Sequence, residues 1–143
     1  MPAVTHLVLV VVDDDPHFQF FLKHGLARCG ISHEIITLKN GPELLAMLSQ
    51  PKTDSIDCIL LDMNMPIKNG TDILAEIEQK KLAVGIPIII TSQAIDPAYI
   101  PQILKLGAVK YLEKPSGLDE FMVFAKKVLA AAAEKQKLEK FNS

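Results

Sequence analysis

Apolar and polar positions fall into blocks along this chain of 143 residues. The first block, Leu7 to Val12, is a continuous apolar run rich in β-branched residues, which is typical of a central parallel strand covered on both faces. Four later segments have the same character and a similar length. The predicted strands are therefore 7–12, 33–38, 57–62, 86–91 and 109–112.

Between these strands, apolar residues recur at helical spacing. Asp15 followed by Pro16 predicts the start of the first helix, and Gly30 predicts its end. Ile73, Leu74 and Ile77 mark a helix that follows Gly70. The remaining predicted helices are 43–48, 101–106 and a long last helix that includes residues 118–132.

Two details concern the later helices. Pro101 lacks a backbone donor and crowds the preceding turn, so regular helix is expected only from about Pro101 onward. Ser116 and Asp119 have the spacing of a capping box, which predicts how the last helix begins.

Five strands that alternate with five helices predict an α/β fold, in which a doubly wound, open parallel sheet carries helices on both faces. Ligands of such sheets collect beyond the carboxyl ends of the strands. The unusual polar residues of this chain lie at those ends: Asp13, Asp14, Asp62, Thr91, Ser92 and Lys114.

Composition bounds the class of protein. The 49% hydrophobic and 22% charged content is ordinary for a globular protein, and one domain over residues 1–143 is expected, with a core at about 5–133 and a polar tail at 134–143. The net charge of −2 comes from interspersed acids and bases. It offers no basic field for direct binding to nucleic acid.

The cysteines and the start of the chain indicate the compartment. Cys29 and Cys58 lie in a predicted helix and strand and have no zinc-binding spacing, so they are interpreted as reduced core residues. The apolar run at 7–12 is too short to span a membrane and lacks the features of an export signal. A cytoplasmic protein without a membrane partner is expected.

The strand-end residues also predict chemistry. Converging carboxylates repel each other, and magnesium, which prefers oxygen ligands and leaves room for phosphate oxygens, would compensate. A carboxylate that attacks phosphorus forms an acyl phosphate, while Lys114 would neutralise charge on the transferred group. A hydroxyl at Thr91 or Ser92 could then donate a hydrogen bond to the new phosphate.

Four blocks of sequence, in order, now carry a resemblance. They are VVDDDP (11–16), LLDMNMPIKNG (60–70), IPIIITS (86–92) and GAVKYLEKP (107–115). In these blocks the chain resembles the receiver domains of response regulators in two-component signal transduction. The resemblance implies a flavodoxin-like fold with strand order 2-1-3-4-5.

The resemblance also implies roles for individual residues. Asp62 would be the phosphoacceptor, and Lys114 would bind the phosphoryl group. The family's spacing selects Ser92, not Thr91, as the switch hydroxyl, and Tyr111 matches the switch aromatic. The residues implied to hold Mg²⁺ are Asp13, Asp14, Asp62 and the backbone carbonyl of Asn64.

Partners follow from the same resemblance. The phosphoryl donor would be a sensor histidine kinase or a histidine phosphotransfer protein, and because the chain ends soon after the last helix, a stand-alone receiver that acts through an unknown downstream protein is expected. Whether it forms a homodimer stays open. Gln93 stands where the family usually has a small residue, and we expect its bulk to restrict access to Asp62.

Two other functional hypotheses remain beside the receiver domain. A phosphohydrolase of the haloacid dehalogenase type also uses an aspartyl phosphate, but such enzymes have an acid where Asn64 stands. A pseudo-receiver would keep the fold and bind partners without phosphorylation. Whether the chain turns over any independent substrate stays open, and its histidines (His6, His17, His24 and His33) are interpreted as structural or exposed.

Overall fold

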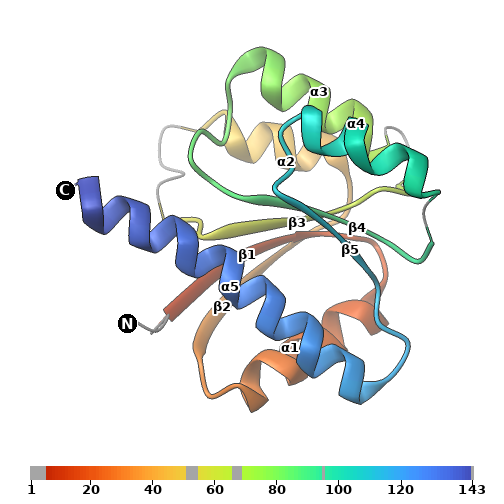
Figure 1. The fold of residues 1–143 in the computed structure, drawn as a ribbon, viewed down its shortest axis with the longest axis vertical. Helices are drawn as coiled ribbons and strands as arrows, with labels where there is room; N and C mark the ends of the chain where they lie inside the picture. The colour runs from red at the N-terminus through yellow and green to blue at the C-terminus, as the bar shows by residue number, and fades with distance from the viewer. Residues whose placement is uncertain (1–5, 51–54, 66–68, 95, 143) are drawn as a thin grey trace.

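Five parallel strands form one sheet between two layers of helices (Figure 1). The computed structural model describes residues 6–50, 55–65, 69–94 and 96–142. The strands are β1 (His6–Val12), β2 (Ser32–Leu38), β3 (Cys58–Asp62), β4 (Ile88–Ser92) and β5 (Lys110–Glu113). Their order is β2-β1-β3-β4-β5 and every pairing is parallel, which confirms the predicted doubly wound, flavodoxin-like sheet.

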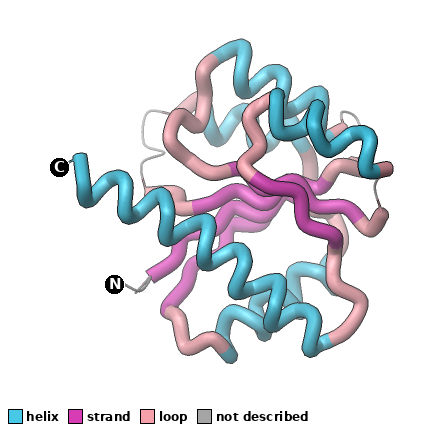
Figure 2. Tube along the Cα trace, in the orientation of Figure 1, coloured by secondary structure: helices cyan, strands magenta, loops and turns pink. Residues whose placement is uncertain are grey.

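The helices divide between the two faces of the sheet. They are α1 (Pro16–Arg28), α2 (Gly41–Leu48), α3 (Gly70–Lys80), α4 (Ile100–Lys105) and α5 (Leu118–Asn142). A 3₁₀ turn, η1 (Pro97–Tyr99), precedes α4. Figure 2 shows the strands as a central layer, with α1 and α5 on one face and α2, α3 and α4 on the other.

Each helical layer buries its own apolar cluster against the sheet. On one face Phe18 of α1 packs on Phe121 and Phe124 of α5, with ring centroids 5.8 and 5.7 Å apart. On the other face Leu44 and Ile73 join the β4 residues Ile88 and Ile90 in a second buried cluster. The central strands β3 and β4 are buried along their whole length, as their unbroken apolar sequences predicted.

Side-chain caps explain where the first three helices begin. The Asp15 side chain accepts a hydrogen bond from the His17 N–H, Asn40 accepts one from Glu43, and Asn69 accepts one from Asp72. Each cap satisfies a backbone donor that has no partner within its helix. The caps at Asp15 and Asn69 mark the first turns of α1 and α3, the helices that follow β1 and β3 along the chain.

The structure confirms the break at Pro101 and corrects two other details. Regular helix begins only at Ile100, after the 3₁₀ turn. β4 begins at Ile88 and not at Ile86, because Pro87 has no N–H to donate to the ladder. It also ends one residue later than predicted, at Ser92.

The predicted capping box at Ser116 and Asp119 is wrong by one residue. The Ser116 N–H and hydroxyl both donate to the Glu120 carboxylate, at 2.8 and 3.0 Å. The reason is that Gly117, not Ser116, accepts the first helical hydrogen bond, from the Phe121 N–H. This places Glu120 at the third helical position, from which a side chain reaches back.

Both cysteines have the predicted character of core residues. Cys58 is fully buried in β3, and burial raises the pKa of its thiol to about 12. Cys29, just after α1, is partly buried, and both are free thiols.

The ends of the described chain also differ in one respect from the expectation. α5 runs on to Asn142, through most of the segment that was interpreted as a polar tail, and passes the edge of the sheet (Figure 1). Within the described residues, no helix has the length and apolar character needed to cross a bilayer.

Candidate functional site

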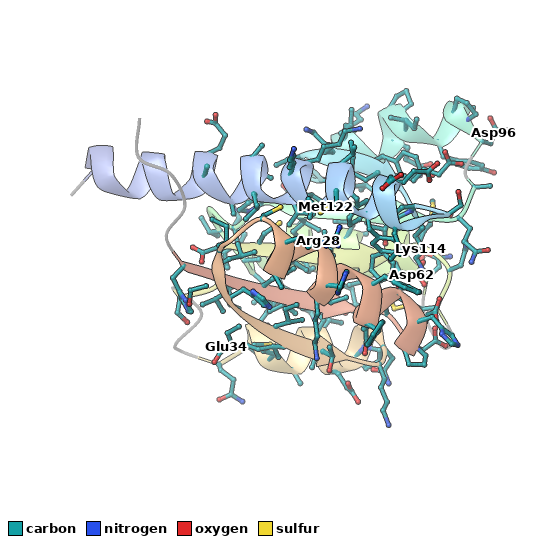
Figure 3. All side chains as sticks on the ribbon, turned by 90° about the horizontal axis from the view of Figure 1, so that it is seen from below. Arg28, Glu34, Asp62, Asp96, Lys114 and Met122 are labelled. Carbon is teal, nitrogen blue, oxygen red and sulfur yellow. The ribbon has the colours of Figure 1, made fainter. Side chains whose placement is uncertain are left out.

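The carboxyl ends of β1, β3, β4 and β5 bring the predicted site residues together. Parallel strands end at the same edge of a sheet, and β3 lies between β1 and β4. Asp13 follows β1, Asp62 ends β3, Ser92 ends β4 and Lys114 follows β5. In Figure 3 the side chains of Asp62 and Lys114 lie close together at this edge.

Asp62 is the central carboxylate of this site. Only 4% of its surface is exposed, its Oδ1 accepts a hydrogen bond from the Asn64 N–H at 3.1 Å, and its Oδ2 lies 3.4 Å from Lys114 Nζ. Burial raises the pKa of Asp62, and the nearby Asp13 raises it further, against the opposing effects of Asn64 and Lys114. The resting carboxylate is therefore a destabilised anion.

Lys114 is the cation that pairs with the buried carboxylates at this edge of the sheet. Its Nζ lies 2.7 Å from Asp13 Oδ2 and 5.0 Å from the centroid of the Phe18 ring. Burial alone would lower the pKa of Lys114, but Asp13 and then Asp62 raise it above the ordinary value. Because its backbone N–H also donates to the Ser92 carbonyl at 2.8 Å, the lysine is fixed to the end of β4.

Three carboxylates at this edge form a cluster suited to a cation. Oxygens of Asp13, Asp14 and Asp62 all lie within 4.8 Å of one another. Asp13 and Asp62 are buried, whereas Asp14 is exposed. Hard divalent cations such as magnesium take carboxylate oxygens and keep some of their water, and an arrangement with one open side suits such an ion.

Ser92 has a fully buried hydroxyl with two partners. It donates to the Ala94 carbonyl at 3.0 Å and accepts from the Asn64 side-chain amide at 3.2 Å. Thr91, the other candidate hydroxyl, precedes it in the strand, so the two side chains point to opposite faces of the sheet. The Ser92 hydroxyl contacts the loop that follows Asp62 by accepting the hydrogen bond from the Asn64 amide.

Tyr111 lies in β5, beside Ile90 of β4. Its hydroxyl is buried and makes no hydrogen bond within the described part of the chain. Burial raises the pKa of Tyr111, and Glu113 raises it further, while the nearby Ser92 lowers it to a smaller extent. The ring is therefore turned inward, toward the same region as Ser92.

A close approach holds α3 against the end of β3. The Gly70 N–H donates to the Met63 carbonyl at 2.9 Å, and a Cβ at Gly70 would lie 3.0 Å from the Asp62 carbonyl oxygen. Glycine permits this contact because it has no side chain. Pro66, in the same loop, lies outside the described residues.

A cavity of about 520 Å³ opens beside the site, between the start of α1 and the start of α5. Aromatic side chains line it together with Gln93 and Lys114. This cavity could not be predicted, because Phe18 and Phe121 recur at helical spacing, which is typical of core positions. Gln93 itself is exposed at the rim, where it borders the approach to Lys114.

Most of the predicted site residues thus meet, and the roles predicted for them stay predictions. Asp13, Asp14, Asp62, Ser92 and Lys114 lie at one edge of the sheet. Asn64 contacts the site through its N–H and its side-chain amide. That its backbone carbonyl binds a metal stays a prediction.

Comparison with known proteins agrees with this geometry. The family that matches the chain is the response regulator receiver domain, over residues 9–126. The DNA-binding transcriptional regulator NtrC of Salmonella typhimurium is 32% identical over 129 residues, which are 90% of this chain and 26% of NtrC. The chain therefore spans about a quarter of the length of that relative.

Solved structures share the fold over most of their length. The phosphorylated cyanobacterial phytochrome response regulator RcpA is 29% identical, with a TM-score of 0.74, and the match covers 86% of this chain and 91% of RcpA. The Mn²⁺-bound form of response regulator Rcp1 is 26% identical, with a TM-score of 0.71, covering 85% of this chain and 91% of Rcp1.

Proposed function

This chain belongs to the response regulator receiver domain family, and on that premise we propose that it is a signalling switch phosphorylated on Asp62. One observation carries the assignment to this residue. Asp62 is the carboxylate at the end of the central strand β3, and Lys114 lies between it and Asp13. Asn64 connects Asp62 to a hydroxyl at the adjacent strand end, since its N–H donates to Asp62 Oδ1 and its side-chain amide donates to Ser92 Oγ.

The proposed reaction transfers a phosphoryl group from a phosphohistidine. An Asp62 oxygen attacks phosphorus, the new O–P bond forms as the P–N bond to the imidazole breaks, and the donor histidine leaves as a neutral imidazole after it takes up a proton from solvent. No general base is needed, because Asp62 reacts as the carboxylate. Lys114 neutralises charge on the transferred group, which is where electrostatic stabilisation contributes most.

A divalent cation fits the acidic cluster. Asp13, Asp14 and Asp62 would hold Mg²⁺, with the Asn64 carbonyl as a further oxygen ligand, and the ion would supply positive charge beside the phosphoryl oxygens. Residues of the chain position the lysine and the carboxylate. Asp13 keeps Lys114 at the site, and Asn64 orients Asp62 through the hydrogen bond from its N–H.

The switch itself would be Ser92 and Tyr111. A phosphoryl group on Asp62 offers new acceptor oxygens, and the Ser92 hydroxyl would leave the Ala94 carbonyl to donate to one of them. This movement would change the surroundings of Tyr111, whose buried hydroxyl has no hydrogen-bond partner among the described residues and lies near Ser92. The surface of α4 and β5 would then differ between the two states. A histidine kinase or a histidine phosphotransfer protein is the proposed donor, and the downstream partner would recognise this surface.

Phosphorylation is tested with a small-molecule donor. The protein is incubated with acetyl phosphate and Mg²⁺, and its intact mass is followed. We expect one phosphoryl group on the wild-type chain and none on Asp62→Asn, while Asp96→Asn, which removes an exposed charge outside the cluster, behaves as wild type. Phosphorylation that persists in Asp62→Asn, or sustained turnover of a phosphoester, would contradict the proposal.

A further inference from the structure

The hydroxyl of Ser92 already has one hydrogen-bond acceptor and one donor as partners in the resting protein. Its one proton is donated to the Ala94 carbonyl, and a lone pair accepts from the Asn64 amide. The hydroxyl is buried, so no bulk water replaces either partner. Ser92 therefore cannot turn toward Asp62 without giving up both hydrogen bonds or carrying Asn64 with it.

Asn64 joins Ser92 to the acceptor loop. Its backbone N–H donates to Asp62 Oδ1 at 3.1 Å, while its side-chain amide donates to Ser92 Oγ at 3.2 Å. One residue thus contacts both the carboxylate that would be phosphorylated and the hydroxyl that would respond. Asn64 is itself exposed, so its side chain is held by this contact and not by packing around it.

We propose that Asn64 is a positioning residue that holds Ser92 in its resting orientation and so sets how readily the switch turns on. The proposal rests on the function proposed above. In the resting state the amide stabilises the orientation in which Ser92 faces Ala94. A phosphoryl group on Asp62 must compete with that hydrogen bond for the Ser92 hydroxyl. The ratio of active to resting molecules is therefore lower by the factor that the hydrogen bond contributes to the resting state.

If the Asn64 amide stabilised the active state instead of the resting state, variants without it would respond in the opposite direction, and this makes the proposal testable. If the Asn64 side chain instead donated to the phosphoryl group, it would stabilise the active state. Removing it would then weaken the response. If it only filled space beside Ser92, a substitution of similar volume would leave the response unchanged.

The test uses Tyr111 as the reporter. The chain has two tyrosines and no tryptophan, so Tyr99→Phe, at an exposed position, leaves Tyr111 as the single tyrosine. In this background, beryllofluoride with Mg²⁺ serves as the phosphoryl mimic, and tyrosine fluorescence is followed during titration. A thermal shift on the same samples gives a second reading of half-saturation, independent of the fluorescence.

We expect Asn64→Ala and Asn64→Leu to lower the beryllofluoride concentration at half-saturation by roughly three- to tenfold, as the loss of one hydrogen bond from the resting state implies. In a Ser92→Ala background the same substitutions should have no effect, because Asn64 acts through the Ser92 hydroxyl. Ser92→Thr, which keeps a hydroxyl, should restore the dependence on Asn64.

Three outcomes would overturn the inference. They are a weaker response in the Asn64 variants, an unchanged response, or an equal effect of the substitutions with and without Ser92. The two proposals fail in different ways. If the wild-type chain does not bind beryllofluoride at all, the proposed function fails, whereas binding that is indifferent to Asn64 removes only the positioning role.

Discussion

At the scale of single residues, Asp62 is held where its negative charge is unfavourable. It is buried beside Asp13, and its pKa is raised, so the folded protein favours the protonated form more than the unfolded chain does. Between the ordinary pKa of an aspartate and the raised one, the folded state binds more protons. Stability therefore falls as the pH rises through that window and stays lower above it.

Because the charge of Asp62 lowers the stability of the folded protein, we expect Asp62→Asn to stabilise the metal-free protein. At neutral pH we expect the free energy of unfolding to rise by on the order of 1 kcal/mol, because the unfavourable charge is gone while Lys114 keeps Asp13 as its partner. Urea unfolding in the presence of a chelator measures it. The gain should shrink as the pH is lowered and Asp62 of the wild type takes up its proton.

Glu34→Gln is the matched control for this charge change. Glu34 is exposed on the edge strand β2, far from the cluster, and its substitution should alter the stability by less than about 0.5 kcal/mol. An Asp62→Asn protein that is less stable than wild type at neutral pH would show that the Lys114 contact outweighs the burial of the charge.

Gln93 gives a second prediction at this scale. It is exposed at the rim of the cavity that reaches Lys114, the lysine whose Nζ lies 3.4 Å from Asp62 Oδ2. We expect Gln93→Ala to speed both phosphorylation by acetyl phosphate and loss of the phosphoryl group by about threefold, or roughly 0.7 kcal/mol of each barrier. Mass spectrometry over time measures both rates, and unchanged rates would show that Gln93 does not restrict access.

The identity of the site residues could be predicted, but their contacts could not. Asp13, Asp62 and Lys114 follow apolar runs whose strand character is plain, so their convergence was visible in the sequence. The hydrogen bond from Ser92 to the Ala94 carbonyl and the position of Phe18 below Lys114 depend on the loops and on helix rotation. Residue spacing carries no information on either.

At the scale of elements, a glycine sets the contact between α2 and α3. A Cβ at Gly41 would clash with Ile73 Cδ1, and because Ile73 is fully buried, its side chain can move away only against its neighbours in the core. We expect Gly41→Ala to lower the free energy of unfolding by about 1–3 kcal/mol through this overpacking. Urea unfolding measures the change.

A double substitution isolates that contact. Ile73→Ala alone should cost about 2–5 kcal/mol by leaving a cavity. In the Ile73→Ala background the added methyl at Gly41 meets no steric conflict, so Gly41→Ala should cost little there or even stabilise the protein, since alanine favours helix more than glycine does. Additive costs would show that the effect at Gly41 lies in the backbone.

Sequence patterns predict where some of the helices begin, but not where all of them do. Asp15 was predicted as a cap from its chemistry, and the break before α4 follows from Pro101. The caps at Asn40 and Asn69 were not predicted, and α2 begins at Gly41 and not at Glu43. The capping box of α5 was misplaced because both Asp119 and Glu120 have a carboxylate, and only the register of the first helical hydrogen bond distinguishes them. That register depends on the path of the chain from β5, which the pattern does not contain.

At the scale of the whole molecule, the sheet order could be predicted because the four matched sequence blocks, in order, include the carboxyl ends of β1, β3, β4 and β5. What could not be predicted is how far α5 runs, since the residues after Glu134 have neither a clear apolar stripe nor a stop signal. The fold places all four reactive strand ends at one edge. A ligand bound there contacts segments that are distant in the sequence, and stabilises their assembly as a unit.

Metal binding should therefore raise the stability of the whole domain. At a Mg²⁺ concentration about 100 times the dissociation constant, the gain is roughly 2.7 kcal/mol, which corresponds to a rise of several degrees in the unfolding midpoint. A thermal scan with Mg²⁺ or with a chelator measures it. Asp14→Asn should lose the shift without losing stability in the chelator, since Asp14 is exposed, while Glu34→Gln should keep it.

The burial of Cys58 has a practical consequence for such measurements. Its thiol lies in the central strand, with no exposed surface and a pKa near 12, so a thiol reagent modifies it only during a global opening of the sheet. In a Cys29→Ser background, the labelling rate of Cys58 then counts these openings directly. Metal or beryllofluoride bound at the opposite end of β3 should slow the labelling, and equal rates with and without ligand would mean that the strand opens without releasing the site.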